Sequence, residues 1–222
     1  MRSLALHAPA FALAILLSGC WVQSLQPFHT PETTAKVPEL AGPWKFVSQF
    51  GDDLTRKEIR PWTFGEKLTA YDRNNVEGTL VYSLFKVGDH VYLDAIAGEP
   101  REESTNAFWH CLVRPVHSLV RVEVKGDELV LLPLSYDWLK EKVEAREVSL
   151  PVLKSEEVDE KEQPKLLFNA SPEQWEQFLK KHGGDEEAFT RKNALVFKRA
   201  AAAPAPPPGA PPPPPLAPPR DF

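Results

Sequence analysis

Apolar residues in the middle of the chain recur in short runs, separated by glycine and polar residues. One such segment spans residues 79–96 with Gly88-Asp89 at its centre, and another spans residues 118–134 with Gly126-Asp127 at its centre. Runs rich in Val, Leu, Tyr and Phe on either side of a Gly-Asp pair are typical of tight hairpins. The pattern therefore predicts two antiparallel β-hairpins.

The first strand of the second hairpin alternates strictly. Leu119, Arg121 and Glu123 take one face, and valines at 120, 122 and 124 take the other. A period of two predicts a strand with one buried face and one solvent face. Shorter apolar runs predict further strands at residues 44–50, 66–72, 166–169 and 194–198.

Two helices are expected among these strands. Ser171 and Gln174 occupy the N-cap and capping-box positions around Pro172, and Gly183-Gly184 ends the segment. Residues 136–145 predict the other helix, with Trp138 and Leu139 facing inward. Many antiparallel strands and two or three short helices predict a mainly β (α+β) fold. We expect a single antiparallel β-barrel-like or strongly curved sheet domain.

Composition divides the chain into four parts. Residues 1–19 have the layout of a signal peptide, and residues 20–40, with three prolines, are interpreted as a tether. Residues 41–199 hold nearly all the periodic apolar pattern and form the β-rich globular domain. Residues 200–222 are a Pro-rich tail, expected to be disordered and extended. This tail suits aromatic-grooved recognition domains, a spacer across an envelope layer, or an inert solvated end.

The N-terminal segment also suggests where in the cell the protein is located. Arg2 precedes an apolar run from Ala8 to Leu17. That run is about ten residues long, below the roughly 20 that a spanning helix needs. Leu17-Ser18-Gly19-Cys20 resembles the lipobox of bacterial lipoproteins. The resemblance implies cleavage before Cys20, lipid on its sulfur, and a lipid-anchored place in the bacterial cell envelope. The alternative is an ordinary signal peptide beside an unrelated cysteine.

Two residues refine this expectation. Trp21, rather than Asp, follows the cysteine, which in the lipoprotein family favours the outer membrane. Lipid on Cys20 leaves Cys111 without a partner, so we expect no disulfide. Removing residues 1–19 takes one Arg from the 26 Lys and Arg, leaving 25 against 31 Asp and Glu. This acidic balance argues against a nucleic-acid partner.

Two further resemblances concern the domain. Gly42-Pro43-Trp44 is similar to the Gly-x-Trp of lipocalin-like barrels, in which the Trp closes one end. In that family a late arginine packs on the Trp, a role that implies Arg199 or Arg191 here. Much of the domain also resembles a group of exported bacterial proteins to which no activity is assigned. The resemblance covers residues 84–94, 117–122 and 137–140 and the helix after Ser171.

Few residues suggest catalysis or metal binding. His110, Cys111 and His117 are chemically suited to zinc, copper or nucleophile activation. Neighbours on a strand face opposite ways, however, so His110 and Cys111 would not converge there. The carboxylates at Asp52-Asp53, Glu102-Glu103 and Asp94 lack a paired nucleophile. We therefore predict that the protein is not an enzyme and that it has no catalytic residue, no metal and no cofactor.

Aromatic side chains give the strongest functional indication. Trp62, Phe64, Phe108 and Trp109 could line an apolar cavity if they point into a barrel, or could simply fill the core. We expect non-enzymatic binding of a small apolar ligand or lipid by a membrane-anchored lipoprotein. The alternative is a structural or interaction protein of the cell envelope, acting on an envelope protein through its sheet surface and Pro-rich tail.

Overall fold

Eight antiparallel strands close into a barrel, as the mainly β pattern predicts. The computed structural model describes residues 21–72, 74–98, 116–154 and 166–201. Around the ring the order is β8-β7-β6-β5-β4-β2-β12-β9, and pairing of β9 with β8 closes it. The barrel strands are β2 (Gly42–Gln49), β4 (Trp62–Phe64), β5 (Leu68–Tyr71), β6 (Glu77–Val87), β7 (His90–Ala97), β8 (His117–Lys125), β9 (Glu128–Pro133) and β12 (Leu195–Arg199).

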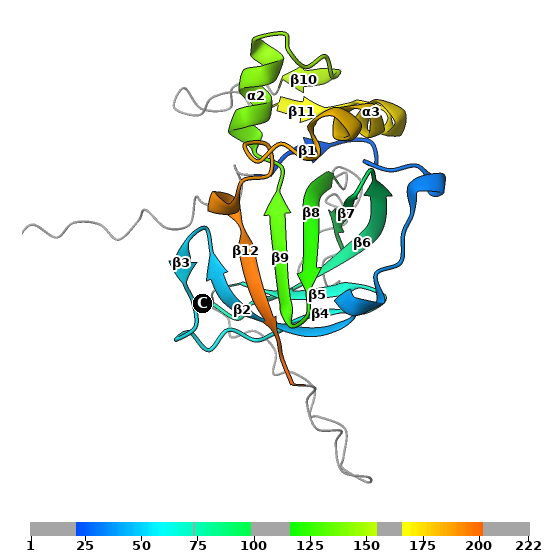
Figure 1. Cartoon of the computed structure of the whole chain (residues 1–222). Helices are drawn as coiled ribbons and strands as arrows, with labels where there is room; N and C mark the ends of the chain where they lie inside the picture. Colours follow the sequence, from blue (N-terminus) through cyan, green and yellow to red (C-terminus); the bar gives the residue numbers. More distant parts are fainter. Residues whose placement is uncertain (1–20, 73, 99–115, 155–165, 202–222) are drawn as a thin grey trace, which may run out of the picture.

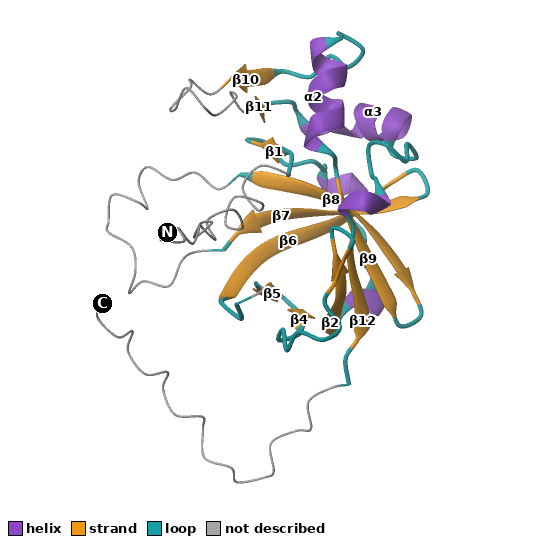
Figure 2. Cartoon of the chain, turned by 90° about the vertical axis from the view of Figure 1, so that its left-hand side faces the viewer, coloured by secondary structure: helices purple, strands orange, loops and turns teal. Residues whose placement is uncertain are grey.

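A second layer covers part of the barrel (Figures 1 and 2). Its short strands continue the sheet beyond β8, and two helices lie with them above the barrel wall. These elements are β1 (Gln23–Ser24), β10 (Val152–Lys154), β11 (Leu166–Phe168), α2 (Tyr136–Glu144) and α3 (Pro172–His182). The remaining elements are the two-residue strand β3 (Asp52–Asp53) and short 3-10 turns at Pro31–Thr33, Pro38–Leu40 and Arg191–Asn193.

The predicted hairpins are confirmed. Val87 pairs with His90 and Lys125 pairs with Glu128, so that a two-residue Gly-Asp loop joins each pair of strands. Gly88 and Gly126 have φ angles of 59° and 58°. A positive φ at the first loop position is the requirement of a type II′ turn, which glycine meets without steric cost.

The predicted cap of α3 is confirmed as well. The Ser171 hydroxyl accepts from the Gln174 backbone N–H, and the Gln174 side chain accepts from the Ser171 N–H. Trp175 and Leu179 are buried on the inner side of the helix. Gly183 ends it, at a position where a Cβ would collide with the hydroxyl of Tyr92.

At β8 the barrel wall is buried on both faces, which the alternation in its sequence did not indicate. Val120 points into the barrel, while Leu119, on the opposite face, packs beneath the helical layer. Arg121, expected in solvent, is only 8% exposed. Its guanidinium donates to the backbone oxygen of Gly183 at 2.9 Å and to Glu123 at 3.1 Å. The expectation of one solvent face was wrong because α3 and its C-terminal turn cover it.

Residues 21–40 are part of the fold, so their interpretation as a tether was wrong. We call this segment the strap; it runs in blue along one side of the barrel in Figure 1. Its strand β1 pairs with both β8 and β11. Val22, Phe28 and Leu40 are fully or almost fully buried. These apolar residues are too widely spaced to show a period, but Val22 and Phe28 pack into the core outside the barrel wall and Leu40 packs into the core inside it.

The strap ends by closing one end of the barrel. Trp44 is buried there, and its Nε1 donates to the backbone oxygen of Leu40 at 2.7 Å. The guanidinium of Arg199 lies 4.1 Å from the centre of the Trp44 ring. It also donates to the backbone oxygens of Ala41, at 3.0 Å, and of Glu39. An arginine therefore packs on Trp44 as expected, and it is Arg199 rather than Arg191.

Other sequence-based expectations fall outside the described residues. These are the signal peptide, Cys20, most of the segment that follows β7, the charged segment after β10 and the Pro-rich tail from residue 202 on.

Replacing Arg199 should loosen the closed end. We expect Arg199→Ala to lower the free energy of unfolding by about 2 kcal/mol, because a ring contact and two charged hydrogen bonds disappear. Arg191→Ala is the matched control, since its side chain is 64% exposed in an ion pair with Glu123. Urea denaturation should give a loss below about 1 kcal/mol for that control. Equal losses in the two variants would contradict the role of Arg199.

Candidate functional site

The two ends of the barrel differ. At the closed end lie Trp44, Arg199 and the two Gly-Asp hairpins. At the other end, which we call the mouth, lie the turn after β2, the turn between β5 and β6, and the start of β12. Trp21, the first described residue of the strap, forms an isolated bridge with Ser135 just beyond β9, at the mouth.

A pocket of about 330 Å³ opens at the mouth. Phe46, Trp62 and Leu195 contribute to its lining from the barrel wall, together with Ala70 and Leu80 from β5 and β6. The strap, the end of β5 and the turns add apolar surface through Trp21, Phe50, Ile59, Tyr71 and Val76. The remaining lining residues are Gln49, Asp72, Glu77 and Gly78.

Three aromatic rings, packed edge-on or tilted against one another, lie between this pocket and the closed end. Phe46 and Phe197 lie with ring centres 4.2 Å apart, and Trp62 lies 5.2 Å from each of them. The Trp62 Nε1 donates to the backbone oxygen of Tyr71 at 2.8 Å. Its one donor is therefore used within the protein, and the ring offers the pocket an apolar surface.

The four aromatic residues expected to line a cavity lie in different places. Trp62 lines the pocket, and its role toward a ligand stays a prediction. Phe64 is buried in the barrel core, 5.6 Å from the Tyr82 ring, and is not part of the pocket lining. Phe108 and Trp109 lie outside the described residues.

Sequence reasoning missed most of the pocket. Phe46 was detectable, since it alternates with Trp44 in a predicted strand and so faces the same interior. Leu80 and Leu195 lie in predicted strands, but only the curvature of the sheet decides whether they meet. Ile59 and Val76 belong to turns without apolar periodicity, and no local signal points to them.

Polar groups at the rim are already engaged. The Tyr71 hydroxyl donates to Glu77 at 2.7 Å. Asp72 accepts from the backbone N–H groups of Asn74 and Val76, each at 2.8 Å. The Arg60 guanidinium lies 4.2 Å from the centre of the Tyr71 ring. Gln49, buried in the wall, also has an interaction partner. The described pocket therefore presents mainly carbon to a ligand.

A second polar cluster lies on the outer face of the barrel, under the strap. The Asp94 carboxylate on β7 accepts from the backbone N–H of Phe28 at 3.0 Å. Its two oxygens also lie 3.1 Å from Nδ1 of His29 and 2.8 Å from Nδ1 of His117. Asp94 is thus a buried carboxylate with three partners, two of which belong to the strap.

These partners decide the charge of Asp94. Burial alone would raise its pKa, but the hydrogen bonds from His117, His29 and the Phe28 N–H lower the pKa below its usual value. An ionised carboxylate can only accept, so each Nδ1 carries the proton that it donates. Among the described residues, no group of three or more His, Cys, Asp and Glu side chains is placed to hold a metal ion. His110 and Cys111, considered earlier with His117, lie outside those residues.

Comparison with protein-family models, curated proteins and solved structures finds no match to this chain. Within the described residues, no helix has the length and apolar character to cross a membrane.

Asp94 should stabilise the fold in a pH-dependent way. A folded-state pKa below the unfolded value of about 3.9 means that the carboxylate stabilises the fold above that pH. The contribution is lost as the pH falls through the folded-state pKa. We expect Asp94→Asn to cost about 1–3 kcal/mol at pH 7, because one of its two buried acceptor oxygens becomes an NH2 donor and the negative charge is lost.

Denaturation curves recorded between neutral pH and pH 2 test this expectation, with the exposed Asp89→Asn as the matched control. The stability of the wild-type protein and of the control should fall at acid pH more steeply than that of Asp94→Asn. If the free energy of unfolding fell equally steeply at acid pH in all three proteins, Asp94 would not hold the strap through its charge.

Proposed function

We propose that this protein is an exported, membrane-anchored lipoprotein whose barrel binds a small apolar ligand or lipid in the mouth pocket, without catalysing a reaction. The observation that carries the proposal is the pocket itself. It is lined by Phe46, Trp62, Leu80 and Leu195 and opens at one end of a barrel whose other end is closed by Trp44. Concave, mainly apolar sites of this kind are the usual binding sites for small molecules.

The size of the pocket limits the ligand. Its volume of about 330 Å³ lies near the lower end of the roughly 300–1,000 Å³ range of ligand pockets. The aromatic rings of Phe46, Trp62 and Phe197 stop a ligand from passing further into the barrel. A single acyl chain inserted part of its length, or a compact ring compound, fits this description.

The chemistry of the lining favours an apolar body with any polar part left outside. The Trp62 donor is satisfied by Tyr71, and the carboxylates of Asp72 and Glu77 accept hydrogen bonds from their own turn. A polar group pushed into the described pocket would lose water without gaining a partner, which costs about 1–3 kcal/mol. These features support binding rather than catalysis. The anchor on Cys20 and the outer-membrane location belong to the proposal through the lipobox resemblance.

Filling the pocket should abolish binding. We expect Ala70→Phe, which places a ring in the pocket, to weaken the binding of the fluorescent probe N-phenyl-1-naphthylamine by at least about tenfold. The protein would be residues 20–222 with Cys20→Ser, secreted behind an ordinary signal peptide so that no attached lipid competes. Probe fluorescence and displacement by a fatty acid give the affinities.

Val81→Phe is the matched control. Val81 is 39% exposed and lies one residue from Leu80, on the opposite face of β6. It adds the same ring outside the pocket and should leave the affinity unchanged, while both variants should keep the wild-type melting temperature. If a folded Ala70→Phe protein binds the probe like the control, the pocket is not the binding site.

A further inference from the structure

We infer that the mouth of the barrel faces the membrane that anchors the protein, so that the pocket opens directly onto the lipid surface. This inference rests on the proposed function, because it needs the lipid on Cys20. It adds an interaction surface, made by the rim residues Trp21, Phe50 and Val76, and it commits that surface to one partner, a bilayer.

The strap is fixed up to its first described residue. Val22 is fully buried, and Gln23 and Ser24 pair with β8 on one side and β11 on the other. The Ser24 hydroxyl also accepts from Nε1 of the buried Trp175 at 3.3 Å. A chain paired on both sides and packed from below cannot swing away from the barrel without breaking these contacts.

This rigidity places the point of attachment. Trp21 lines the pocket, and Cys20 is the next residue toward the N-terminus. One residue spans at most about 3.6 Å, so a lipid on Cys20 cannot hold the mouth far from the headgroups. A free tether of twenty residues would instead have allowed roughly 25 Å and any orientation.

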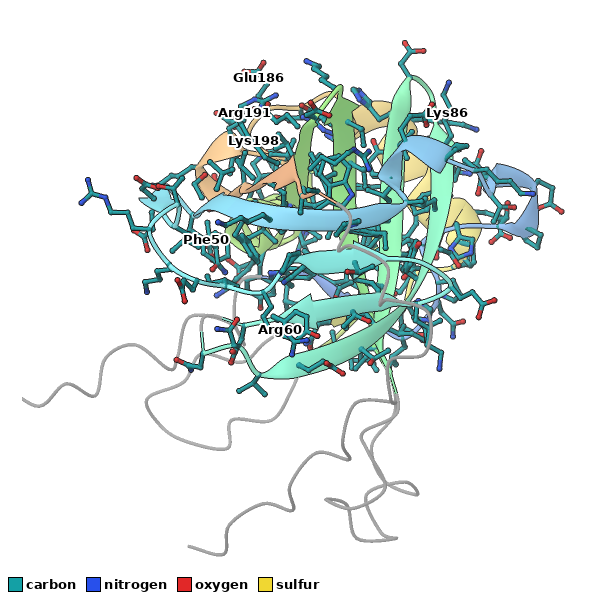
Figure 3. All side chains as sticks on the ribbon, turned by 90° about the horizontal axis from the view of Figure 1, so that it is seen from below. Phe50, Arg60, Lys86, Glu186, Arg191 and Lys198 are labelled. Atoms are coloured by element: carbon teal, nitrogen blue, oxygen red, sulfur yellow. The ribbon has the colours of Figure 1, made fainter. Side chains whose placement is uncertain are left out.

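The mouth and the closed end differ in the way this orientation requires. Val76 at the rim is 63% exposed, the largest exposure among the large apolar residues of the described chain. Trp21 and Phe50, which line the same pocket, are half-buried, and tryptophan rings favour the interface of a bilayer. The hairpin at the opposite end instead exposes Lys86 and Asp89, and Figure 3 shows Lys86 well apart from Phe50 and Arg60.

The charge of the rim indicates how the surface is held. Asp72 and Glu77 lie there together with Arg60, so the described rim is not basic and gains nothing from anionic headgroups. Attachment then depends on the acyl chains of Cys20 and on shallow contact by Trp21 and Val76. An apolar ligand could move between pocket and bilayer without crossing water.

The experiment uses the full lipidated chain in vesicles of phosphatidylcholine, part of which carries bromine on its acyl chains. In a Cys111→Ser background, Val76→Cys and the exposed Lys86→Cys are each labelled with bimane, and quenching of the label by the brominated lipid is measured. We expect several-fold stronger quenching at position 76 than at position 86. Replacing part of the phosphatidylcholine with phosphatidylglycerol should not change the ratio.

Equal quenching at the two positions, or stronger quenching at position 86, would overturn the inference, and so would a chain that carries no lipid at Cys20. A third outcome is a label at position 76 that the bromines do not quench, in a protein that binds the probe only when it carries no lipid. That result would show that the acyl chain on Cys20 fills the pocket, and it would also overturn the inference. The probe assay of the lipid-free chain is independent of orientation. If the lipid-free chain does not bind the probe, the proposed function is contradicted, whereas the orientation shown by the quenching is unaffected.

Discussion

The wall formed by β6, β7, β8 and β9 carries apolar side chains on both faces, and the rest of the structure follows from the need to cover them. Inside the barrel, Leu93, Val120 and Leu131 pack with residues from β2 and β12. Outside, Phe85, Leu119 and Leu132 need a second cover, which α2, α3 and the strap supply. Apolar surface of this extent contributes roughly 25 cal/mol per Å² removed from water. Without the strap and helices, the outer face of the wall would be left in solvent.

This cover has a consequence for function. Because Val22 and Phe28 must reach the outer face, the N-terminal segment is drawn along the whole length of the barrel, from Trp21 at the mouth to Leu40 at the closed end. Asp94 adds a polar fixing point halfway, through His29 and the Phe28 N–H. The same burial that stabilises the wall therefore decides where an N-terminal anchor would hold the molecule.

The fold was largely predictable, since its signals are local. The Gly-Asp hairpins and the Ser171 capping box depend on neighbouring residues alone, and the structure has both. The site was predictable only in part. Trp62 and Phe64 were both expected in a cavity. Trp62 lines the pocket, whereas Phe64, two residues away on the same face of a short strand, lies in the barrel core. The depth at which Phe46, Trp62 and Phe197 meet depends on strand tilt and register around a closed ring, which no short segment encodes.

Misinterpretation of the strap and of Arg121 has one common cause. Sparse prolines and the absence of a period in residues 21–40 suggested a linker, and alternation in β8 suggested a solvent face. Both inferences assume that an element meets only its own neighbours in the sequence. Here the strap and β8 are joined by pairing between residues about 95 positions apart, Gln23 with Ser118, and Arg121 reaches the end of α3 at Gly183.

Methyl NMR of the lipid-free chain can show directly whether an apolar ligand occupies the barrel mouth. Ile59, Leu80 and Leu195 line the pocket, whereas Leu119 and Leu132 lie on the outer face of the wall. On titration with a fatty acid, we expect the methyl signals of the first three residues to shift with a common saturation curve while those of the other two stay in place. Shifts confined to Leu119 and Leu132, or the absence of any shift at saturating fatty acid, would contradict it.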